Sequence, residues 1–380
     1  MQTTLVNARV LTPQGWREDV AIVVDGKSIH AITPTAALPN DAIRRDLSGR
    51  ILLPGFIDCQ VNGGGGVLFN DQPTVAGIRA IGAAHRRFGT TGFLPTLISD
   101  DIETMRTAIE AVENAISENV PGVLGIHLEG PFISRERKGV HAESFLHAPD
   151  AGELRLAASL RHGRTLLTLA PECVSSTAIS ELSDAGAIVA AGHSNADYAT
   201  VRAALDSGVR GFTHLYNAMS PLTSRAPGMV GAALDDADSW CGIIVDGHHV
   251  APASLRVALK AKPRGKLFLV TDAMPPVGAP DPSFVLNGET ITARDGICQT
   301  ANGTLAGSAL SMIEAVRNAI DMLDIPLDEA ARMASTYPAE FLGLGASHGR
   351  IDAGCRANFT VVDEQLRVTE TWIDGVAQAA

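Results

Sequence analysis

Apolar and polar residues follow one rhythm at the two ends of the chain and another in the middle. In "LVNARVLTPQGWREDVAIVVDGKSIHAI" (5–32) they alternate around turn pairs such as Asp25-Gly26, which is typical of short antiparallel strands. The C-terminal stretch "GRIDAGCRANFTVVDEQLRVTETWIDG" (349–375) alternates in the same way. We therefore expect a small β-sandwich domain built from both termini, residues 1–52 plus 352–380.

Between these ends, short apolar runs are separated by helical patterns. Eight candidate strands cover residues 51–58, 90–98, 122–130, 165–172, 187–194, 211–218, 241–249 and 266–273. After the second run, the apolar residues Ile102, Met105, Ile109, Val112 and Ile116 recur at helical spacing and predict an amphipathic helix. Eight strands alternating with helices favour an α/β fold, a (β/α)8 TIM-like barrel over residues 53–351, with a doubly wound open sheet as the alternative.

Composition narrows the classes of partner. Thirty Lys plus Arg against 42 Asp plus Glu give a formal charge of −12, which argues against nucleic acid or an anionic membrane as the main partner. A small anionic substrate would need a local basic pocket. The N-terminus lacks a signal pattern and no apolar stretch approaches the length of a membrane span, so we expect a cytoplasmic protein. The five Cys residues are scattered without CxxC spacing, which suggests neither disulfides nor a thiolate zinc site.

The predicted strands end in polar residues that apolar packing does not require. These are Asp58 to Asn62, His127, Glu129, Glu172, His193, His214, Asp246, His248, His249 and Asp272. In a parallel barrel the carboxyl ends of the strands meet at one mouth, so we expect these residues to converge there.

Three of the strand-end residues have the character of metal ligands. Glu129, His193 and His214 would give two imidazoles and one carboxylate, a common set for catalytic Zn²⁺ that leaves a position open for water. A single His at a strand end is as readily a hydrogen-bonded core residue, but three such ends at one mouth favour metal binding. Asp272 could exchange a proton with metal-bound water, although by itself it is more readily interpreted as the cap of a turn or of the next helix.

Other features carry weaker signals. The run Gly63 to Gly66 lacks the arrangement of a nucleotide-binding loop, so a flexible loop after the first strand is the expectation. Arg225, in "SPLTSRAPG", reads by itself as a solvated surface charge. The remaining histidines show no partner pattern and are expected to be structural: His30, His85, His147, His162 and His348.

The motifs together resemble those of a known family. "PGFIDCQVNG", "GIHLEGPFIS", "AGHSNADY", "FTHLYNAM", "IVDGHHV", "VTDAM" and "LAGSAL" resemble the N-acetylglucosamine-6-phosphate deacetylases of the amidohydrolase superfamily over nearly the whole chain. The resemblance implies hydrolysis of the acetamido group of a sugar phosphate by a homodimer. It also implies residue roles: Glu129, His193 and His214 as ligands of one metal, Asp272 as acid/base, His141 beside the acetyl group, and Asn217, Ala218, Arg225 and His249 as sugar-phosphate contacts.

Gln60 and Asn62 stand where many superfamily members carry a His pair on the first strand. Amides are poor zinc ligands, so these residues resemble the single-metal branch and mark vestigial positions of a second metal. We expect one divalent ion per chain, Zn²⁺ first, with Fe²⁺ or a similar ion as the alternative. Three other functions stay open: deacetylation of the galactosamine C4 epimer, another amidohydrolase activity, and a non-catalytic sugar-phosphate sensor.

Overall fold

Eight parallel strands form the central sheet of the computed structural model, which describes residues 2–380. In sheet order they are β8 (Phe56–Val61), β11 (Thr90–Ile98), β12 (Gly125–Glu129), β13 (Arg164–Leu169), β14 (Ile188–Ala191), β15 (Val209–Phe212), β16 (Trp240–Ile243) and β17 (Leu267–Leu269). The sheet closes beyond the end of β17, where Val61 and Ala273 form a parallel bridge. Sheet order follows chain order without the reversal of a doubly wound sheet, so the barrel prediction is confirmed.

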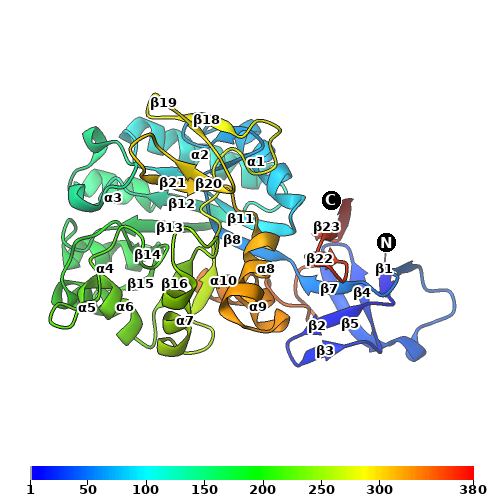
Figure 1. Cartoon of the computed structure of the whole chain (residues 1–380). Helices are drawn as coiled ribbons and strands as arrows, with labels where there is room; N and C mark the ends of the chain where they lie inside the picture. Colours follow the sequence, from blue (N-terminus) through cyan, green and yellow to red (C-terminus); the bar gives the residue numbers. More distant parts are fainter. Residues whose placement is uncertain (1) are drawn as a thin grey trace.

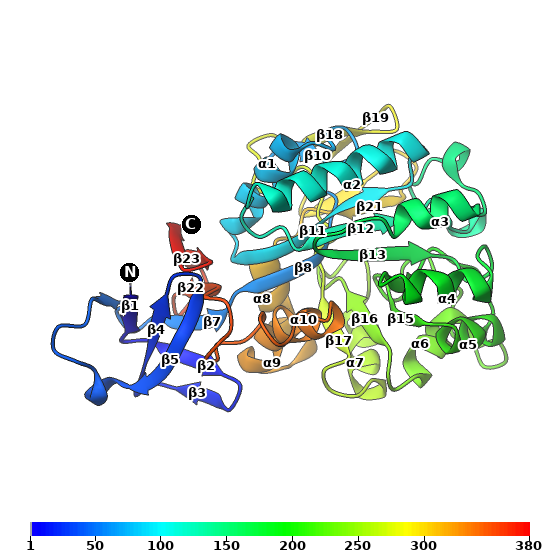
Figure 2. The same cartoon turned by 180° about the vertical axis from the view of Figure 1, so that it is seen from behind.

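Helices cover the outside of the barrel (Figures 1 and 2). They are α1 (Val75–Arg86), α2 (Ile102–Ser117), α3 (Ala151–Ala157), α4 (Ser176–Asp184), α5 (Tyr198–Asp206), α6 (Gly228–Asp235), α7 (Pro252–Ala261), α8 (Met312–Leu323), α9 (Leu327–Met333) and α10 (Thr336–Phe341), with 3-10 turns at Thr35–Ala37, Arg135–Arg137 and Glu143–Phe145. Helix α2 is the amphipathic helix expected from the sequence. The Asp101 carboxylate caps its first turn by accepting from the backbone N–H of Thr104, and Met105, Ile109 and Val112 are buried against the barrel.

Two further sheets lie at the ends of the chain, on the right of Figure 1, the first built from the N-terminal segment and the second from both ends. One contains, in order, β5 (Ser28–Pro34), β4 (Val20–Asp25), β1 (Gln2–Val6) and β6 (Arg44–Asp46); the other contains β24 (Val376–Ala379), β23 (Val368–Ile373), β22 (Phe359–Val362), β7 (Ile51–Pro54), β2 (Arg9–Thr12) and β3 (Gly15–Arg17). Their buried apolar residues, among them Leu5, Ile22, Phe359 and Trp372, form a core separate from that of the barrel. The termini thus assemble as a sandwich beside the barrel.

The run 51–58, expected to be one strand, is two. Strand β7 ends at Pro54 in the terminal sheet, and β8 begins at Phe56 in the barrel. Gly55 lies between them, where an added Cβ would come within 2.2 Å of the Thr91 side chain. Glycine permits this close passage, and the chain changes sheets at that residue.

Small hairpins follow two of the barrel strands at the mouth. Strands β9 (Gly63–Gly64) and β10 (Val67–Leu68) form one hairpin after β8. Strands β18 (Ser283–Leu286), β19 (Glu289–Thr292), β20 (Ile297–Gln299) and β21 (Leu305–Ser308) form two more between Asp272 and α8, seen at the top of Figure 1. Sequence reasoning missed this segment, although Asn287-Gly288 within alternating residues is a recognised hairpin signal.

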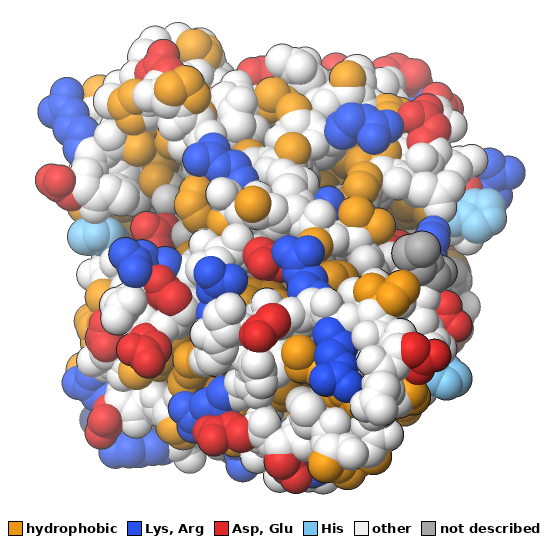
Figure 3. Space-filling view, turned by 90° about the vertical axis from the view of Figure 1, so that its right-hand side faces the viewer, with side chains coloured by type: hydrophobic (Ala, Val, Ile, Leu, Met, Phe, Trp, Pro, Cys, Tyr) orange, Lys and Arg blue, Asp and Glu red, His pale blue; other side chains and the backbone are white. Residues whose placement is uncertain are grey.

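The face that carries the terminal sheets has a mixed surface. Figure 3 shows acidic and basic side chains interspersed over it, with small apolar groups between them. Among residues 2–380, no helix combines the length and the apolar character needed to cross a bilayer.

Candidate active site

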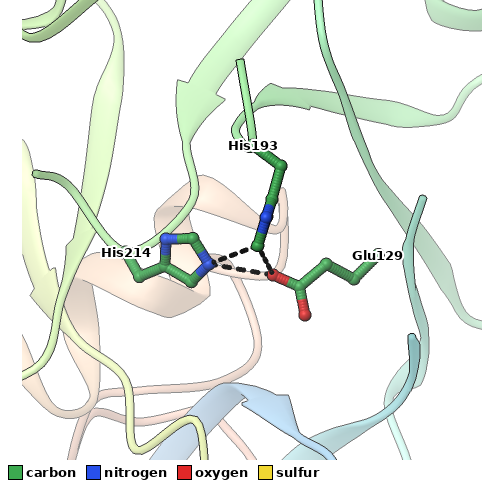
Figure 4. Close-up of side chains that lie close together, drawn as sticks. All are labelled: Glu129, His193 and His214. Carbon is green, nitrogen blue, oxygen red and sulfur yellow. Dashed lines mark hydrogen bonds and ion pairs between the residues drawn. The ribbon is translucent and has the colours of Figure 1, made fainter. Parts of the chain in front are cut away.

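Three side chains from the ends of three barrel strands converge on one point at the mouth (Figure 4). Glu129 is the last residue of β12, and His193 and His214 follow the ends of β14 and β15. His193 and His214 have left-handed backbones, with φ of 47° and 33°. Such strain persists only where the surrounding structure enforces it, and it is concentrated at functional sites.

Hydrogen bonds orient the cluster. The Nδ1–H of His193 donates to the carbonyl of Arg137 at 2.8 Å, so its Nε2 presents a lone pair to the cluster. Burial alone would raise the pKa of Glu129, but the adjacent imidazoles of His193 and His214 outweigh this effect and hold that pKa well below its ordinary value. Glu129 is therefore an anion at neutral pH.

The donor set has the spacing and chemistry that a cation requires. The two Nε2 atoms of His193 and His214 are 3.1 Å apart, and Glu129 Oε1 lies 3.2 Å from the first and 2.9 Å from the second. Ligand atoms about 2.0–2.1 Å from a tetrahedral metal lie roughly 3.3 Å from one another. Two imidazole lone pairs and a carboxylate aimed at one point repel each other unless positive charge lies between them, so these residues fit a divalent ion.

Asp272 lies beside the cluster in a strained and buried position. Its φ is 52°, and its backbone N–H donates to the carbonyl of Gln60 at 3.1 Å. Its Oδ1 accepts from the side-chain amides of Asn62 at 2.6 Å and Gln60 at 3.1 Å. Burial, together with the negative charge of Glu129, raises the pKa of Asp272 to about 6. A carboxyl group with a pKa near the working pH can both accept and return a proton.

Gln60 and Asn62 present their amide NH₂ groups to this region. The Gln60 amide donates to Glu129 Oε1 as well as to Asp272, both at 3.1 Å. A ligand to a metal must offer a lone pair, whereas these nitrogens offer hydrogen. The Gln60 amide therefore links Glu129 to Asp272, and the Asn62 amide holds Asp272 from a second position.

His141 comes from the loop after β12 and is held by the end of β11. Its Nδ1 accepts from the backbone N–H of Ser99 at 3.2 Å and lies 2.7 Å from the Ser99 hydroxyl. The proton of the ring is thus on Nε2. Burial lowers the pKa of His141 to about 3, so the ring is a neutral hydrogen-bond donor. Its centroid lies 4.5 Å from that of His193.

A cavity of about 350 Å³ joins these groups. It is lined by Asn62, Ile98, Glu129, Glu136, Arg137, Gly139, Val140, His141, His193, His214, Asn217, Ala218, His249, Asp272, Met274, Thr304, Leu305 and Gly307. The expected sugar contacts Asn217, Ala218 and His249 are therefore at the cavity, and His249 Nδ1 is paired with Asp246 at 2.6 Å.

Arg225 is the exception among the expected site residues. It lies in an exposed loop before α6, does not line the cavity, and its side chain makes no hydrogen bond or ion pair with any of residues 2–380. The structure of a single chain therefore does not bring Arg225 together with the other expected residues.

Three other strand-end residues make hydrogen bonds to groups inside the protein. Asp58 is buried and accepts from the Thr271 hydroxyl and backbone, one layer below Asp272. His127 lies between the hydroxyls of Thr96 and Thr168 in the barrel interior. Glu172 accepts from Ser194 and Asn195 and so fixes the turn that carries His193. These polar ends support the site without lining its cavity.

The glycine run, expected from the sequence to be a flexible loop, lies in the hairpin of β9 and β10. Gly65 and Gly66 have φ of 63° and 83° and form the turn of the β9–β10 hairpin. A Cβ on Gly64 would lie 2.8 Å from the ring of His85, whose Nε2 donates to the Gly63 carbonyl. The buried His85 therefore packs directly beneath this hairpin.

Several lining residues escaped sequence reasoning. Glu136 and Arg137 lie on a 3-10 turn after β12, and Met274, Thr304 and Gly307 come from the segment between Asp272 and α8. No residue spacing marks them, since long-range packing brings their loops to the mouth. The motif "LAGSAL" (305–310), used above only for the resemblance, was the one available signal for the last loop.

Comparisons with known proteins agree with this geometry. Residues 51–377 match the amidohydrolase family, and residues 4–52 match the NagA composite domain. An N-acetylgalactosamine-6-phosphate deacetylase of Shewanella sp. (strain ANA-3) is 44% identical, covering 97% of this chain and 94% of the relative. An N-acetylglucosamine-6-phosphate deacetylase of Haemophilus influenzae is 37% identical over 99% of both chains. The crystal structure of the N-acetylglucosamine-6-phosphate deacetylase of Pasteurella multocida superposes with a TM-score of 0.97 at 39% identity, covering 100% of both.

Proposed function

Because the chain belongs to the amidohydrolase family, we propose that it hydrolyses the acetamido group of N-acetylglucosamine 6-phosphate to glucosamine 6-phosphate and acetate. One observation carries the proposal: the Glu129, His193 and His214 cluster shares a cavity with a buried carboxyl group whose pKa is about 6. Relatives of full length at 37–44% identity that are named for sugar-phosphate deacetylation support the substrate class.

Glu129, His193 and His214 would hold one divalent metal ion, with Zn²⁺ as the first choice and Fe²⁺ as an alternative. When bound, such an ion supplies Lewis acidity that acidifies water and polarises the amide carbonyl. Gln60 and Asn62 support a single ion, because their amides face Glu129 and Asp272 as hydrogen-bond donors. Elemental analysis of the purified protein checks this, and two ions per chain would contradict it.

In the proposed reaction Asp272 serves twice. It accepts the proton of the attacking water as the oxygen bonds to the acyl carbon, and it later returns that proton to the nitrogen as the C–N bond breaks. The amine then departs in a neutral form, and acetate is the second product. The hydrogen bonds from Asn62 and Gln60 hold the Asp272 carboxylate in place for both transfers.

His141 would stabilise the oxygen of the acyl group. Its protonated Nε2 is available because the Ser99 N–H occupies Nδ1. As negative charge grows on the carbonyl oxygen, a neutral donor fixed beforehand stabilises the transition state more than the ground state.

We propose that the sugar and phosphate lie toward Asn217, Ala218 and His249, and that Arg225 binds the phosphate. Because Arg225 lies away from the cavity of its own chain, this role would be filled across the interface of a homodimer. A bidentate guanidinium is well suited to a phosphate group.

The C4 epimer, N-acetylgalactosamine 6-phosphate, is the second candidate substrate. The 44% identical Shewanella relative is named for it, which favours this alternative directly. Both sugars present the same acetamido group, so the proposed chemistry is common to them.

The proposal also covers domain organisation and location. Residues 1–52 with 352–380 would form the small domain and 53–351 the catalytic barrel, supported by the separate apolar core of the terminal sheets; Met1 lies outside the described residues. We place the reaction in the cytoplasm, since a charged sugar phosphate does not cross a bilayer unaided.

Acetate release by the purified protein tests the proposed function. It is measured with both epimers, before and after chelation, and again after Zn²⁺ is restored. Metal-dependent release that favours the glucosamine substrate supports the proposal, and release that favours the epimer supports the second candidate. No release from either sugar by the metal-loaded protein would refute both.

A further inference from the structure

The cavity has one continuous apolar side. Ile98, Val140 and Met274 all line it, and they belong with Phe284 and Leu286 to one apolar cluster at the barrel mouth. The same cavity is also lined by polar residues, including Asn217 and His249. A substrate held here therefore meets both a clustered apolar surface and polar groups.

Each residue of this apolar side lies next to a group of the proposed chemistry. Val140 directly precedes His141, and Met274 lies two positions after Asp272. Ile98 precedes Ser99, whose backbone N–H holds the His141 ring. These three residues share the cavity with His141 and Asp272 and form its clustered apolar lining, so they offer an apolar surface to the remaining substituent of the acyl group.

Resting on the proposed function, we propose that Ile98, Val140 and Met274 form an acyl wall, which receives the methyl of the acetyl group and excludes longer acyl chains. The enzyme would thereby be selective for the acyl group as well as for the sugar. A methyl group gains from apolar contact, whereas each added methylene would have to displace side chains of the wall.

Contacts outside the cavity fix the positions of two residues of the acyl wall, Met274 and Val140. The Met274 side chain lies over Gly307, where an added Cβ would come within 2.6 Å of Met274 Cγ, and the Met274 N–H donates to the Ser308 carbonyl at 2.9 Å. The Asn287 amide donates to the Val140 carbonyl at 2.7 Å and ties the loop of Val140 to the β18–β19 hairpin. Neither residue can retreat without breaking these contacts.

A second cavity of about 250 Å³ lies behind the loop that carries Val140. Gly139, Val140, His141 and Thr304 line both cavities. Val140 therefore lies at the boundary between the two cavities, and we expect that shortening its side chain provides room for a longer acyl chain.

The test compares acyl selectivity between the metal-loaded wild type and Val140→Ala. The substrates are the N-acetyl, N-propionyl and N-butyryl forms of the 6-phosphorylated amino sugar, in whichever epimer the wild type prefers. We expect the ratio of kcat/KM for propionyl over acetyl to rise by about tenfold or more, the scale of one methylene in a fitted pocket. Met274→Ala should raise the same ratio.

Leu305→Ala is the matched control. Leu305 is apolar and lines the same cavity but lies outside the cluster of the acyl wall, so its truncation should leave the ratio unchanged. If Val140→Ala does not fold, Ile98→Val takes its place, and a higher ratio again supports the acyl wall.

The outcomes separate the two proposals. Failure of the wild type to release acetate from either epimer overturns the proposed function and the acyl wall with it. Acetate release by the wild type with an unchanged ratio in the wall variants, or a ratio raised only by Leu305→Ala, overturns the acyl wall alone.

Discussion

The floor of the cavity and the exposed loop outside the cavity that carries Arg225, which we call the rim, are built in opposite ways. At the floor, Asp272 accepts from two amides, His141 is held by Ser99, and His193 is held by the Arg137 carbonyl. At the rim, Arg225 is exposed and its side chain makes no hydrogen bond or ion pair with any of residues 2–380. A single chain thus organises the groups for bond cleavage but leaves its candidate phosphate ligand free. Preorganised groups cost little reorganisation during reaction, whereas a free arginine must be ordered by substrate or by another subunit.

Asp272→Asn should have the largest effect and tests the floor. The amide oxygen can still accept from Asn62 and Gln60, so the fold and the metal content should be retained. Loss of the group that carries the proton should lower kcat by on the order of 10³-fold or more. Steady-state kinetics with parallel metal analysis checks this, and full activity would remove Asp272 from the mechanism.

Arg225→Ala tests the rim. Loss of a charge-assisted contact to phosphate, about 1.5–3 kcal/mol, should raise KM for the phosphorylated sugar roughly 10- to 150-fold. Turnover of the unphosphorylated sugar should barely change. Equal losses on both substrates would mean that Arg225 does not bind the phosphate.

Mixing the two variants sharpens the comparison. If Arg225 acts across a dimer interface, consider a hybrid dimer of one Arg225→Ala subunit and one Asp272→Asn subunit. The Arg225→Ala subunit supplies a native Asp272, and its partner supplies a native Arg225, so one of the two sites contains both native residues. Activity with a low KM should then reappear after the subunits are exchanged. The same mixture without exchange is the control. If exchange restores nothing although hybrids form, Arg225 acts within its own chain or not at all.

His85, which packs beneath the β9–β10 hairpin, provides a test with a smaller expected effect. Burial lowers the pKa of His85 to about 4, against an ordinary value of 6.5, so the unfolded state binds the extra proton first as the pH falls. The contribution of His85 to stability is complete above pH 6.5 and is lost as the pH falls toward 4.

The measurement is the free energy of unfolding at pH 7 and pH 5, for the wild type and for His85→Gln. The wild type should lose roughly 2 kcal/mol more than the variant between these values, from about 1.4 kcal/mol per pH unit. The variant serves as the control for all other titrating groups. Equal losses in both proteins would show that His85 is not the group responsible.

Sequence patterns were most informative where the cause was local. Apolar runs predicted the eight barrel strands, and the spacing from Ile102 to Ile116 predicted α2. The switch of sheets at Gly55 was missed, because it depends on the side chain of Thr91, which is distant in the sequence.

The residues of the candidate site fall into the same two groups: those predicted from local patterns and those that depend on distant parts of the chain. Glu129, His193, His214 and Asp272 follow strand ends, so the geometry of a parallel barrel alone predicts that they meet. His141 lies in a loop and was found only through the resemblance, while Met274 and Gly307 depend on how the hairpins fold back over the mouth. The proposed role of Arg225 at the phosphate would depend on association between chains, which a single sequence does not encode in any local pattern.

The sheet that contains β7 also bears on the order of events during synthesis. Strand β7 pairs with β22, which comes from near the other end of the chain, and it runs through Gly55 directly into β8, the first barrel strand. On the ribosome β7 emerges early, and its antiparallel neighbour arrives only after the whole barrel has been made. The nascent chain must therefore keep an apolar strand edge unpaired throughout elongation, and this edge is a natural place for a chaperone to bind.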